Sequence, residues 1–170
     1  MEHKKQLGHR NLLYPAVADY LDQIGAPYEI VPIDPEFADT AAFCEKYGFP
    51  PGQSANTIII ASKRKDPTVY CACVVLATTR LDVNRSVKQL MNVSRVSFAN
   101  AEQMMELTGM EMGGVTPFGL PDDLPLYVDS RIMALDWIIL GAGGREAKMK
   151  ISPDVFKQMP SAKTIENLAT

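Results

Sequence analysis

Apolar residues recur along the chain with two different periods, which predict helices and strands. A helical period marks five apolar residues near the N-terminus: Leu12, Leu13, Val17, Leu21 and Ile24. This period predicts a helix over residues 11–24, with Gly25 as its C-terminal cap. A period of two marks residues 147–151, in which Lys148 and Lys150 alternate with apolar side chains. The alternation predicts a strand with one face in solvent.

Short apolar runs and capping residues predict the other elements. Two buried strands over residues 56–62 and 69–77, separated by the polar turn KRKDP, predict an antiparallel hairpin. Asp39 and Asn100 are placed to cap helices, and Gln103 completes a capping box with Asn100. The remaining predicted elements are strands at 28–33 and 95–98, in LPLYVDS up to Asp129 and in WIILGAGG, and helices at 40–47, at 82–91, from Asn100 to Gly109 and from Ser152 onward.

These elements predict a single α/β domain. Hairpins interspersed with short helices favour a mixed sheet flanked by helices. The 170 residues fit one domain of ordinary size, and no repeat, linker or low-complexity segment interrupts them. Residues 1–10 and 160–170 are expected to be loose tails of this domain.

The composition is typical of a soluble globular protein. Hydrophobic residues make up 46% and charged residues 22% of the chain, and no run of about 18 apolar residues predicts a membrane span. The polar N-terminus lacks a secretory signal, and three cysteines without disulfide spacing favour a reducing, cytoplasmic location. The net charge of −3 argues against DNA binding. Basic clusters around Lys63 and Arg80 could contact a few phosphates, or could simply be solvated surface.

Neither a metal site nor a nucleophilic dyad is predicted. His3 and His9 both lie near the N-terminus, and no CxxC or HxxxH pair is present. Cys71 and Cys73 share one face of a strand and Cys44 stands alone, so the cysteines are interpreted as small core residues. There is no GxSxG motif, and a Cys–His dyad would have to recruit an N-terminal histidine.

The segment WIILGAGGREA is similar to a dinucleotide-binding fingerprint but does not complete it. Gly141 and Gly143 match the first two glycines, whereas Glu146 stands at the third position. The residues that follow have a strand pattern where the fingerprint requires a helix. A tight hairpin turn is the simpler interpretation of these glycines.

The loop GMEMGGVTPFGLP has unusual control over its backbone. Gly113 and Gly114 can take positive φ and allow close approach to bare backbone, while Pro117 fixes its own φ and removes one donor. Val115 and Thr116 between them are stiff at χ1. The segment therefore predicts a rigid loop whose N–H groups can hold a carbonyl or carboxyl oxygen. A plain connector from helix to strand is the alternative.

This loop resembles that of the YbaK / prolyl-tRNA-synthetase-associated editing domain family. TGMEMGGVTPFGLP resembles the family's G-x-x-x-P loop, carried here by Gly113, Gly114 and Pro117. Three further segments occur in the family's order. SANTIIIAS resembles its substrate-side strand, TTRLDVNRSVKQL its strand-to-helix corner, and LYVDS with ILGAGG its paired strands. The resemblance covers about residues 26–159 and implies a mixed, strongly twisted, barrel-like sheet.

The resemblance implies a trans-acting aminoacyl-tRNA deacylase, which hydrolyses the ester between a wrong amino acid and its tRNA. The loop backbone from Gly113 to Pro117 would hold the aminoacyl group, with Val115, Thr116 and Phe118 beside the substrate. Because the ester is already activated, a placed water or ribose hydroxyl suffices, and neither a triad nor a cofactor is needed. The implied partners are the 3′ aminoacyl end of tRNA and an aminoacyl-tRNA synthetase, in the cytoplasm, without membrane or DNA.

One departure from the family concerns the substrate-side strand. The family carries a lysine there that is important for activity, whereas this chain has Asn56. Asparagine forms hydrogen bonds but brings no charge, so Lys63 and Arg80 are candidates for a substitute cation. Alternatively, Asn56 merely satisfies backbone groups at a strand edge. Two other functions then remain open: a binding or adaptor protein that has lost the chemistry, and hydrolysis of small aminoacyl or acyl esters without tRNA.

Two further residues have alternative interpretations. Asp129, at a strand end, either orients the site and meets the substrate ammonium, or caps the turn at Ser130. Phe118 either walls the pocket or belongs to the core. The position of each side chain relative to the loop decides between these interpretations.

Overall fold

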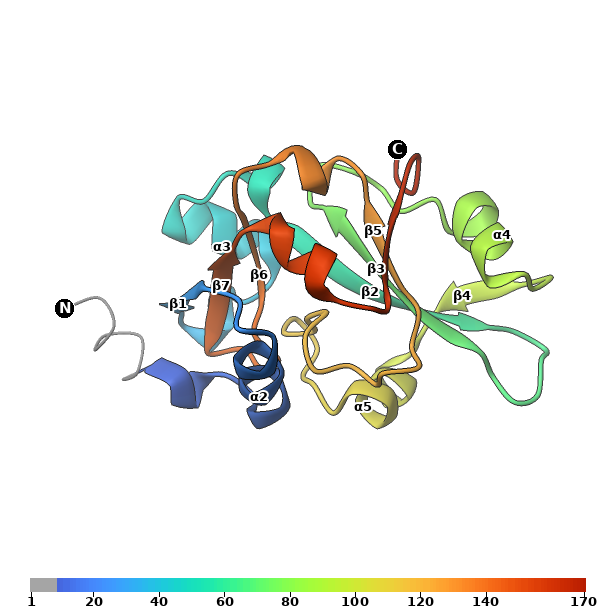
Figure 1. The fold of residues 1–170 in the computed structure, drawn as a ribbon, viewed down its shortest axis with the longest axis horizontal. Helices are drawn as coiled ribbons and strands as arrows, with labels where there is room; N and C mark the ends of the chain where they lie inside the picture. Colours follow the sequence, from blue (N-terminus) through green and yellow to red (C-terminus); the bar gives the residue numbers. More distant parts are fainter. Residues whose placement is uncertain (1–8) are drawn as a thin grey trace.

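Two β-sheets organise residues 9–170, the part of the chain that the computed structural model describes (Figure 1). The larger sheet has the strand order β4-β2-β3-β5-β8, and the smaller sheet has the order β1-β7-β6. The strands are β1 (Tyr28–Pro32), β2 (Ala55–Ser62), β3 (Tyr70–Leu76), β4 (Val96–Phe98), β5 (Leu126–Asp129), β6 (Ile138–Gly141), β7 (Ala147–Ile151) and β8 (Ala162–Ile165).

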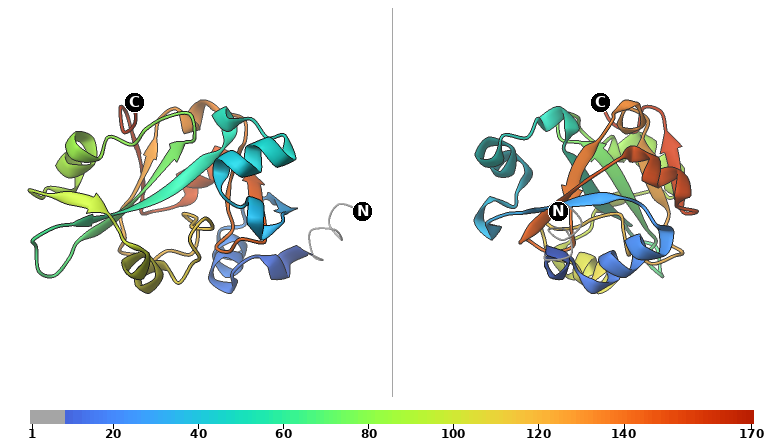
Figure 2. Two further views of the ribbon diagram at one scale, coloured as in Figure 1. Left: turned by 180° about the vertical axis from the view of Figure 1, so that it is seen from behind. Right: turned by 60° about the vertical axis from the view of Figure 1, so that its left-hand side comes forward.

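Helices surround these sheets (Figures 1 and 2). Over the described residues the α-helices are α2 (Pro15–Ile24), α3 (Thr40–Tyr47), α4 (Lys88–Met91) and α5 (Ala101–Thr108). The views place α2 and α5 on the same side of the molecule and α4 beside β4. α3 packs on the smaller sheet through Phe43, which contacts a cluster containing Ile139. None of the helices within residues 9–170 combines the length and apolar character that a bilayer span requires.

The strand pairing confirms the predicted mixed sheet. β2 and β3 form the expected antiparallel hairpin, with Asn56 opposite Val75 and Ile60 opposite Cys71. β6 and β7 are also antiparallel, so the glycines between them lie in a hairpin connection. Because β5 pairs parallel with both β3 and β8, the larger sheet is mixed.

Predicted helix ends agree with the structure at the capping residues. Asn100 Oδ1 accepts from the Gln103 amide at 2.8 Å, and the Asn100 amide donates to Gln103 Oε1 at 3.0 Å. Gly25 ends α2 with a left-handed φ of 67°. Asp39 stands at the N-cap of α3 but makes no capping hydrogen bond, since its carboxylate accepts from Arg145 instead.

The barrel-like closure that was predicted for the sheet is wrong. The strands divide into two sheets that meet at a parallel bridge between Ser54 and Ile139. A barrel requires a continuous ladder of paired strands, whereas β4 and β8 are at the edges of one sheet and β1 and β6 at the edges of the other. The opening between the two sheets is where the site described below forms.

The C-terminal segment over residues 160–170 is not a loose tail, contrary to the prediction. β8 adds to the larger sheet beside β5, and Leu168 is fully buried. This segment lacks a strong period of its own, so its order comes from tertiary pairing. Of the predicted N-terminal tail, residues 1–8 lie outside the described residues, and Arg10 is held by Asp22 through a hydrogen bond of 2.9 Å.

Candidate functional site

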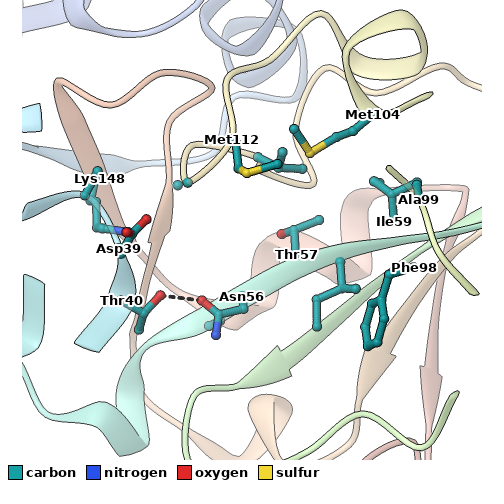
Figure 3. Close-up of a pocket in the computed structure, with 16 residues that line it drawn as sticks. Asp39, Thr40, Asn56, Thr57, Ile59, Phe98, Ala99, Met104, Met112 and Lys148 are labelled. Carbon is teal, nitrogen blue, oxygen red and sulfur yellow. Dashed lines mark hydrogen bonds between the residues drawn. The ribbon is translucent and has the colours of Figure 1, made fainter. Parts of the chain in front are cut away.

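A cavity of about 270 Å³ opens between β2, the smaller sheet and the loop that follows α5 (Figure 3). Its polar wall residues are Asp39, Thr40, Asn56, Thr57 and Lys148. Apolar side chains from β2, β4 and α5 cover the rest of the wall. This volume suits a small organic group held by a few polar contacts.

The loop over residues 109–121 lies against the β6–β7 hairpin through close backbone approach. Gly113 has a φ of 86°, in the left-handed region that favours glycine. A Cβ added at Gly114 would lie 2.7 Å from the carbonyl carbon of Gly144, so only glycine lets the two backbones meet. The Gly143 amide donates to the Gly114 carbonyl at 2.7 Å. These contacts fix the loop at the edge of the cavity.

Several amides of this loop have no hydrogen-bond partner within residues 9–170, and two of them belong to residues that line the cavity. The Gly114 amide donates to the Glu111 carbonyl at 2.9 Å, whereas the amides of Gly113 and Val115 donate to no group of the described chain. Gly113 and Val115 both line the cavity. A carbonyl or carboxylate oxygen of a ligand can therefore accept from this backbone, as in an oxyanion hole.

The Arg145 side chain ties the loop to the segment before α3. Its Nη1 donates to the Met112 carbonyl at 2.9 Å and to Asp39 Oδ1 at 3.2 Å, and its Nη2 donates to the Pro35 carbonyl at 3.0 Å. The guanidinium packs so closely on Gly113 that a Cβ there would collide with Nη1. The sequence prediction missed Arg145, although an arginine directly after the glycines of the hairpin was a visible signal.

Neutral polar groups come to the cavity from β2. The Thr40 hydroxyl donates to Asn56 Oδ1 at 2.6 Å, which leaves the amide nitrogen of Asn56 for a ligand (Figure 3). The next residue, Thr57, also lines the cavity, and its buried hydroxyl has no partner among the described residues. β2 therefore offers hydrogen-bonding groups without charge.

A cationic group comes to the cavity from Lys148, which the alternating pattern placed on a solvent face. That prediction is wrong, because α3 covers this face of β7. Lys148 is only 6% exposed, and its Nζ lies 5.1 Å from the centroid of the Phe43 ring. Burial lowers the pKa of Lys148, while nearby Cys44 and Asp39 act to raise that pKa and Arg145 acts to lower it.

Three of the predicted loop residues do not line the cavity. Phe118 is fully buried in the core and stacks on Phe156 with ring centroids 6.3 Å apart, so it does not wall the cavity. Thr116 is buried as well, and Pro117 lines a different surface hollow beside Tyr20. The prediction of a rigid backbone beside the ligand therefore applies to the part of the loop around Gly113 and Val115, which line the cavity.

The charged residues that were predicted for the site do not line this cavity. Lys63 is exposed in the β2–β3 turn and lines none of the described cavities. Asp129 is 1% exposed and accepts from the Arg131 amide at 3.0 Å, so it caps the turn after β5 and does not reach the cavity. Arg80 lines a neighbouring cavity of about 500 Å³ that shares Asn56 with the first.

The cysteines behave as core residues, as predicted. Cys71 and Cys73 are fully buried with their sulfur atoms 3.9 Å apart, and Cys44 is buried beside the Ser54 hydroxyl. Over residues 9–170 no three His, Cys, Asp or Glu side chains gather where they could hold a metal ion. His3 lies outside the described residues.

Comparison with known proteins identifies a family whose model matches most of the chain. Residues 34–159 match the family model described as the aminoacyl-tRNA editing domain. A candidate Cys-tRNA(Pro)/Cys-tRNA(Cys) deacylase of Enterococcus faecalis, EbsC, is 22% identical over 122 residues, which cover 72% of each chain. The proline–tRNA ligase of Bacillus licheniformis is 38% identical over 71 residues, which are 40% of this chain and 12% of the ligase.

A solved structure shares the fold. It is that of a candidate trans-editing enzyme for prolyl-tRNA synthetase, with a TM-score of 0.75 and 21% sequence identity. The match covers 91% of this chain and 97% of that one. At this identity the likeness is one of fold.

Proposed function

Because the chain belongs to the aminoacyl-tRNA editing domain family, we propose that it hydrolyses the ester between a mismatched amino acid and its tRNA, in trans to the synthetase. Membership of the family agrees with the resemblance seen in the sequence. The observation that carries the proposal is the pair of unpartnered amides at Gly113 and Val115 beside the cavity. The names of EbsC and of the solved trans-editing neighbour support it.

In the proposed reaction the ester carbonyl oxygen accepts hydrogen bonds from the Gly113 and Val115 amides. A water oxygen attacks the carbonyl carbon, the bond to the ribose oxygen breaks, and that oxygen takes up a proton. Negative charge develops on the carbonyl oxygen in the transition state, so the same hydrogen bonds strengthen there. Removing one such donor costs about 10²–10³-fold in rate.

The terminal nucleotide of tRNA would lie across the second cavity. This cavity shares Asn56, Ile58 and Phe98 with the first, so one ligand can occupy both. Phe98 is 60% exposed and offers an aromatic face for a base. Arg80 lies in the second cavity and can meet a phosphate. A net charge of −3 fits contact with the tRNA end alone.

A synthetase is proposed as a further partner. The support is the match between this chain and a proline–tRNA ligase, in which a similar stretch belongs to the synthetase itself. A free-standing editing domain would act on tRNA released by such an enzyme. The proposed location is therefore the cytoplasm, where tRNA is charged.

The test is loss of the ester from a panel of mischarged tRNAs. Wild-type protein is expected to deacylate at least one of them and to spare correctly charged tRNA. Val115→Pro removes one free amide from the loop and should lower the rate by about 10²–10³-fold. The absence of turnover on every tRNA would contradict the hydrolase, and equal rates in both proteins would contradict the backbone donors.

A second candidate function is binding without catalysis. Asn56 favours it, since this residue stands where the resemblance to the family places an important lysine and brings no charge. Such an adaptor would bind mischarged tRNA without turnover, and Asn56→Lys would then confer activity. Turnover by the wild-type protein contradicts this candidate.

A further inference from the structure

Lys148 stands beside the loop because of the strand register. It lies directly opposite Gly141 in the antiparallel β6–β7 pair, so their side-chain positions share one face of the sheet. A Cβ at Gly141 would lie 2.6 Å from the Gly114 carbonyl oxygen and 2.7 Å from that of Val115. The loop therefore rests on the glycine that faces Lys148. Lys148 and Val115 line the same cavity.

The side chain of Lys148 is largely buried at the cavity wall, and its ammonium has no ionic partner within residues 9–170. Within residues 9–170 its Nζ makes no hydrogen bond and no salt bridge, and it lies 5.1 Å from the centroid of the Phe43 ring. A charge that is partly withdrawn from water and has no partner carries a desolvation cost. A cation–π contact offsets only part of this cost. An anionic oxygen in the cavity could accept a charge-assisted hydrogen bond from this ammonium.

The other charges near the cavity are already committed. The Asp39 carboxylate accepts from Arg145 at 3.2 Å, and Arg145 also donates to the Met112 and Pro35 carbonyls. The predicted substitutes for the missing strand lysine do not reach this cavity, since Lys63 is in an exposed turn and Arg80 lies in the adjoining cavity. Of the cations in the described chain, Lys148 alone lines the cavity with the loop.

We propose that Lys148 is the cation of this site and that its ammonium binds an anionic oxygen at the ester end of the substrate. The inference rests on the proposed function. The oxygen comes either from the carbonyl of the ester as it gains charge or from the phosphate of the terminal nucleotide, and both present the same chemistry to an ammonium. Lys148 thus replaces, from β7, the charge that Asn56 on β2 does not provide.

Lys148→Met tests this inference with a matched control. Methionine keeps most of the length and packing of the side chain and removes the charge. Lys150→Met is the control, because Lys150 is on the same face of β7 but lies over Trp137, 4.4 Å from its ring centroid, and lines a different surface hollow. We expect Lys148→Met to lower kcat/KM for mischarged tRNA by about 10²–10³-fold, and Lys150→Met to change it by less than about 3-fold. Equal activity of the wild type and a folded Lys148→Met variant would overturn the inference.

Two small substrates identify the source of the oxygen. One is an aminoacyl ester of adenosine, and the other is the same ester of adenosine 5′-monophosphate. A loss confined to the phosphate-bearing ester assigns Lys148 to the phosphate, and an equal loss on both assigns it to the ester oxygen. Either pattern supports the inference, whereas no loss on either substrate overturns it.

A binding measurement separates this inference from the proposed function. The probe is an aminoacyl-adenosine 5′-monophosphate in which an amide replaces the ester, so that no turnover is required. If the wild type has no deacylase activity but binds this probe at least 10-fold more tightly than Lys148→Met does, hydrolysis fails as a function while Lys148 keeps its role. Equal affinities together with equal rates on both small esters overturn the role of Lys148, whereas equal affinities with a lower rate in Lys148→Met assign its ammonium to the carbonyl oxygen that gains charge in the transition state.

Discussion

Arg145 donates a hydrogen bond of 2.9 Å to the carbonyl oxygen of Met112, the residue before Gly113 in the loop. The same nitrogen also contacts Asp39 at 3.2 Å. One guanidinium therefore fixes the distance between the loop and the first turn of α3, which form opposite walls of the cavity. Arginine suits this position because its planar fork can make several hydrogen bonds at once in a fixed geometry.

Arg145→Lys should loosen the loop without unfolding the protein. A lysine ammonium cannot reach Met112, Asp39 and Pro35 together in the geometry of the guanidinium. We expect about a 10-fold fall in kcat/KM on mischarged tRNA and faster hydrogen exchange at the loop amides. Arg131→Lys is the control, since Arg131 is exposed. Unchanged exchange at the loop in Arg145→Lys would show that Arg145 does not order it.

Gly114→Ala tests the close approach of the loop to the β6–β7 hairpin. The new Cβ would lie 2.7 Å from the backbone carbon of Gly144, so one of the two segments must move. Overpacking of this kind costs about 1–3 kcal/mol, measured as the free energy of unfolding in urea. Gly52→Ala is the control, because a Cβ at Gly52 meets nothing within 4 Å. Equal stability of the two variants would mean that the backbone contact is not tight.

Local patterns in the sequence were sufficient for the hairpins and the helix caps. Asn100 and Gln103 satisfy one another's backbone within four residues, so their capping box needs no information from the rest of the fold. The positive φ of Gly113 is likewise a local property, whereas the close contacts of Gly113 with Arg145 and of Gly114 with Gly144 depend on the distant β6–β7 hairpin. The separation into two sheets depends on which strands meet in space, and alternation within a strand does not encode that.

From the sequence, only the part of the site that consists of loop backbone could be predicted. Lys148 was assigned to solvent because the alternation of β7 identifies two faces but not what covers them. The cover comes from α3, through Phe43, over a hundred residues earlier in the chain. The choice between the two interpretations of Asp129 could not be made from the sequence for a related reason. Its distance from the cavity depends on how β5 is placed in the larger sheet. The side chains of a site are positioned by tertiary packing, which single-sequence patterns do not contain.

Phe98→Ala tests the path of the terminal nucleotide. Phe98 is exposed where the two cavities join, and stacking of a base on an aromatic ring contributes about 1–3 kcal/mol. We expect KM for mischarged tRNA to rise about 10-fold with kcat nearly unchanged, while Phe98→Trp keeps the affinity. A small aminoacyl ester without a base should react equally with all three proteins. A fall in kcat on that small ester would place Phe98 at the reacting group instead.

Lys148→Met should make the protein more stable at neutral pH while it impairs the site. The ammonium has no hydrogen-bond partner in the described chain and is partly withdrawn from water, so its cost is at most the roughly 1–3 kcal/mol of a fully buried unpaired polar group. Since burial lowers the pKa of Lys148 in the folded state, the unfolded chain binds more protons in the window between that lowered pKa and the usual lysine value of about 10.4. The contribution of Lys148 to the free energy of unfolding of the wild type therefore rises with pH across that window. Below the window this contribution is at its lowest.

The advantage of Lys148→Met over the wild type should accordingly be largest at neutral pH and shrink as the pH approaches about 10.4. Urea unfolding of both proteins at a series of pH values measures this difference. The groups that face Lys148 are Asp39, Cys44 and Arg145, and Cys44 is the neutral partner whose effect on the pKa of Lys148 can be removed without changing the ion pair of the other two. Cys44→Ser, made in the wild type and in Lys148→Met, controls for the effect of Cys44. A constant difference between wild type and Lys148→Met at every pH would mean that the ammonium is solvated in the folded protein, because a solvated lysine titrates alike in both states.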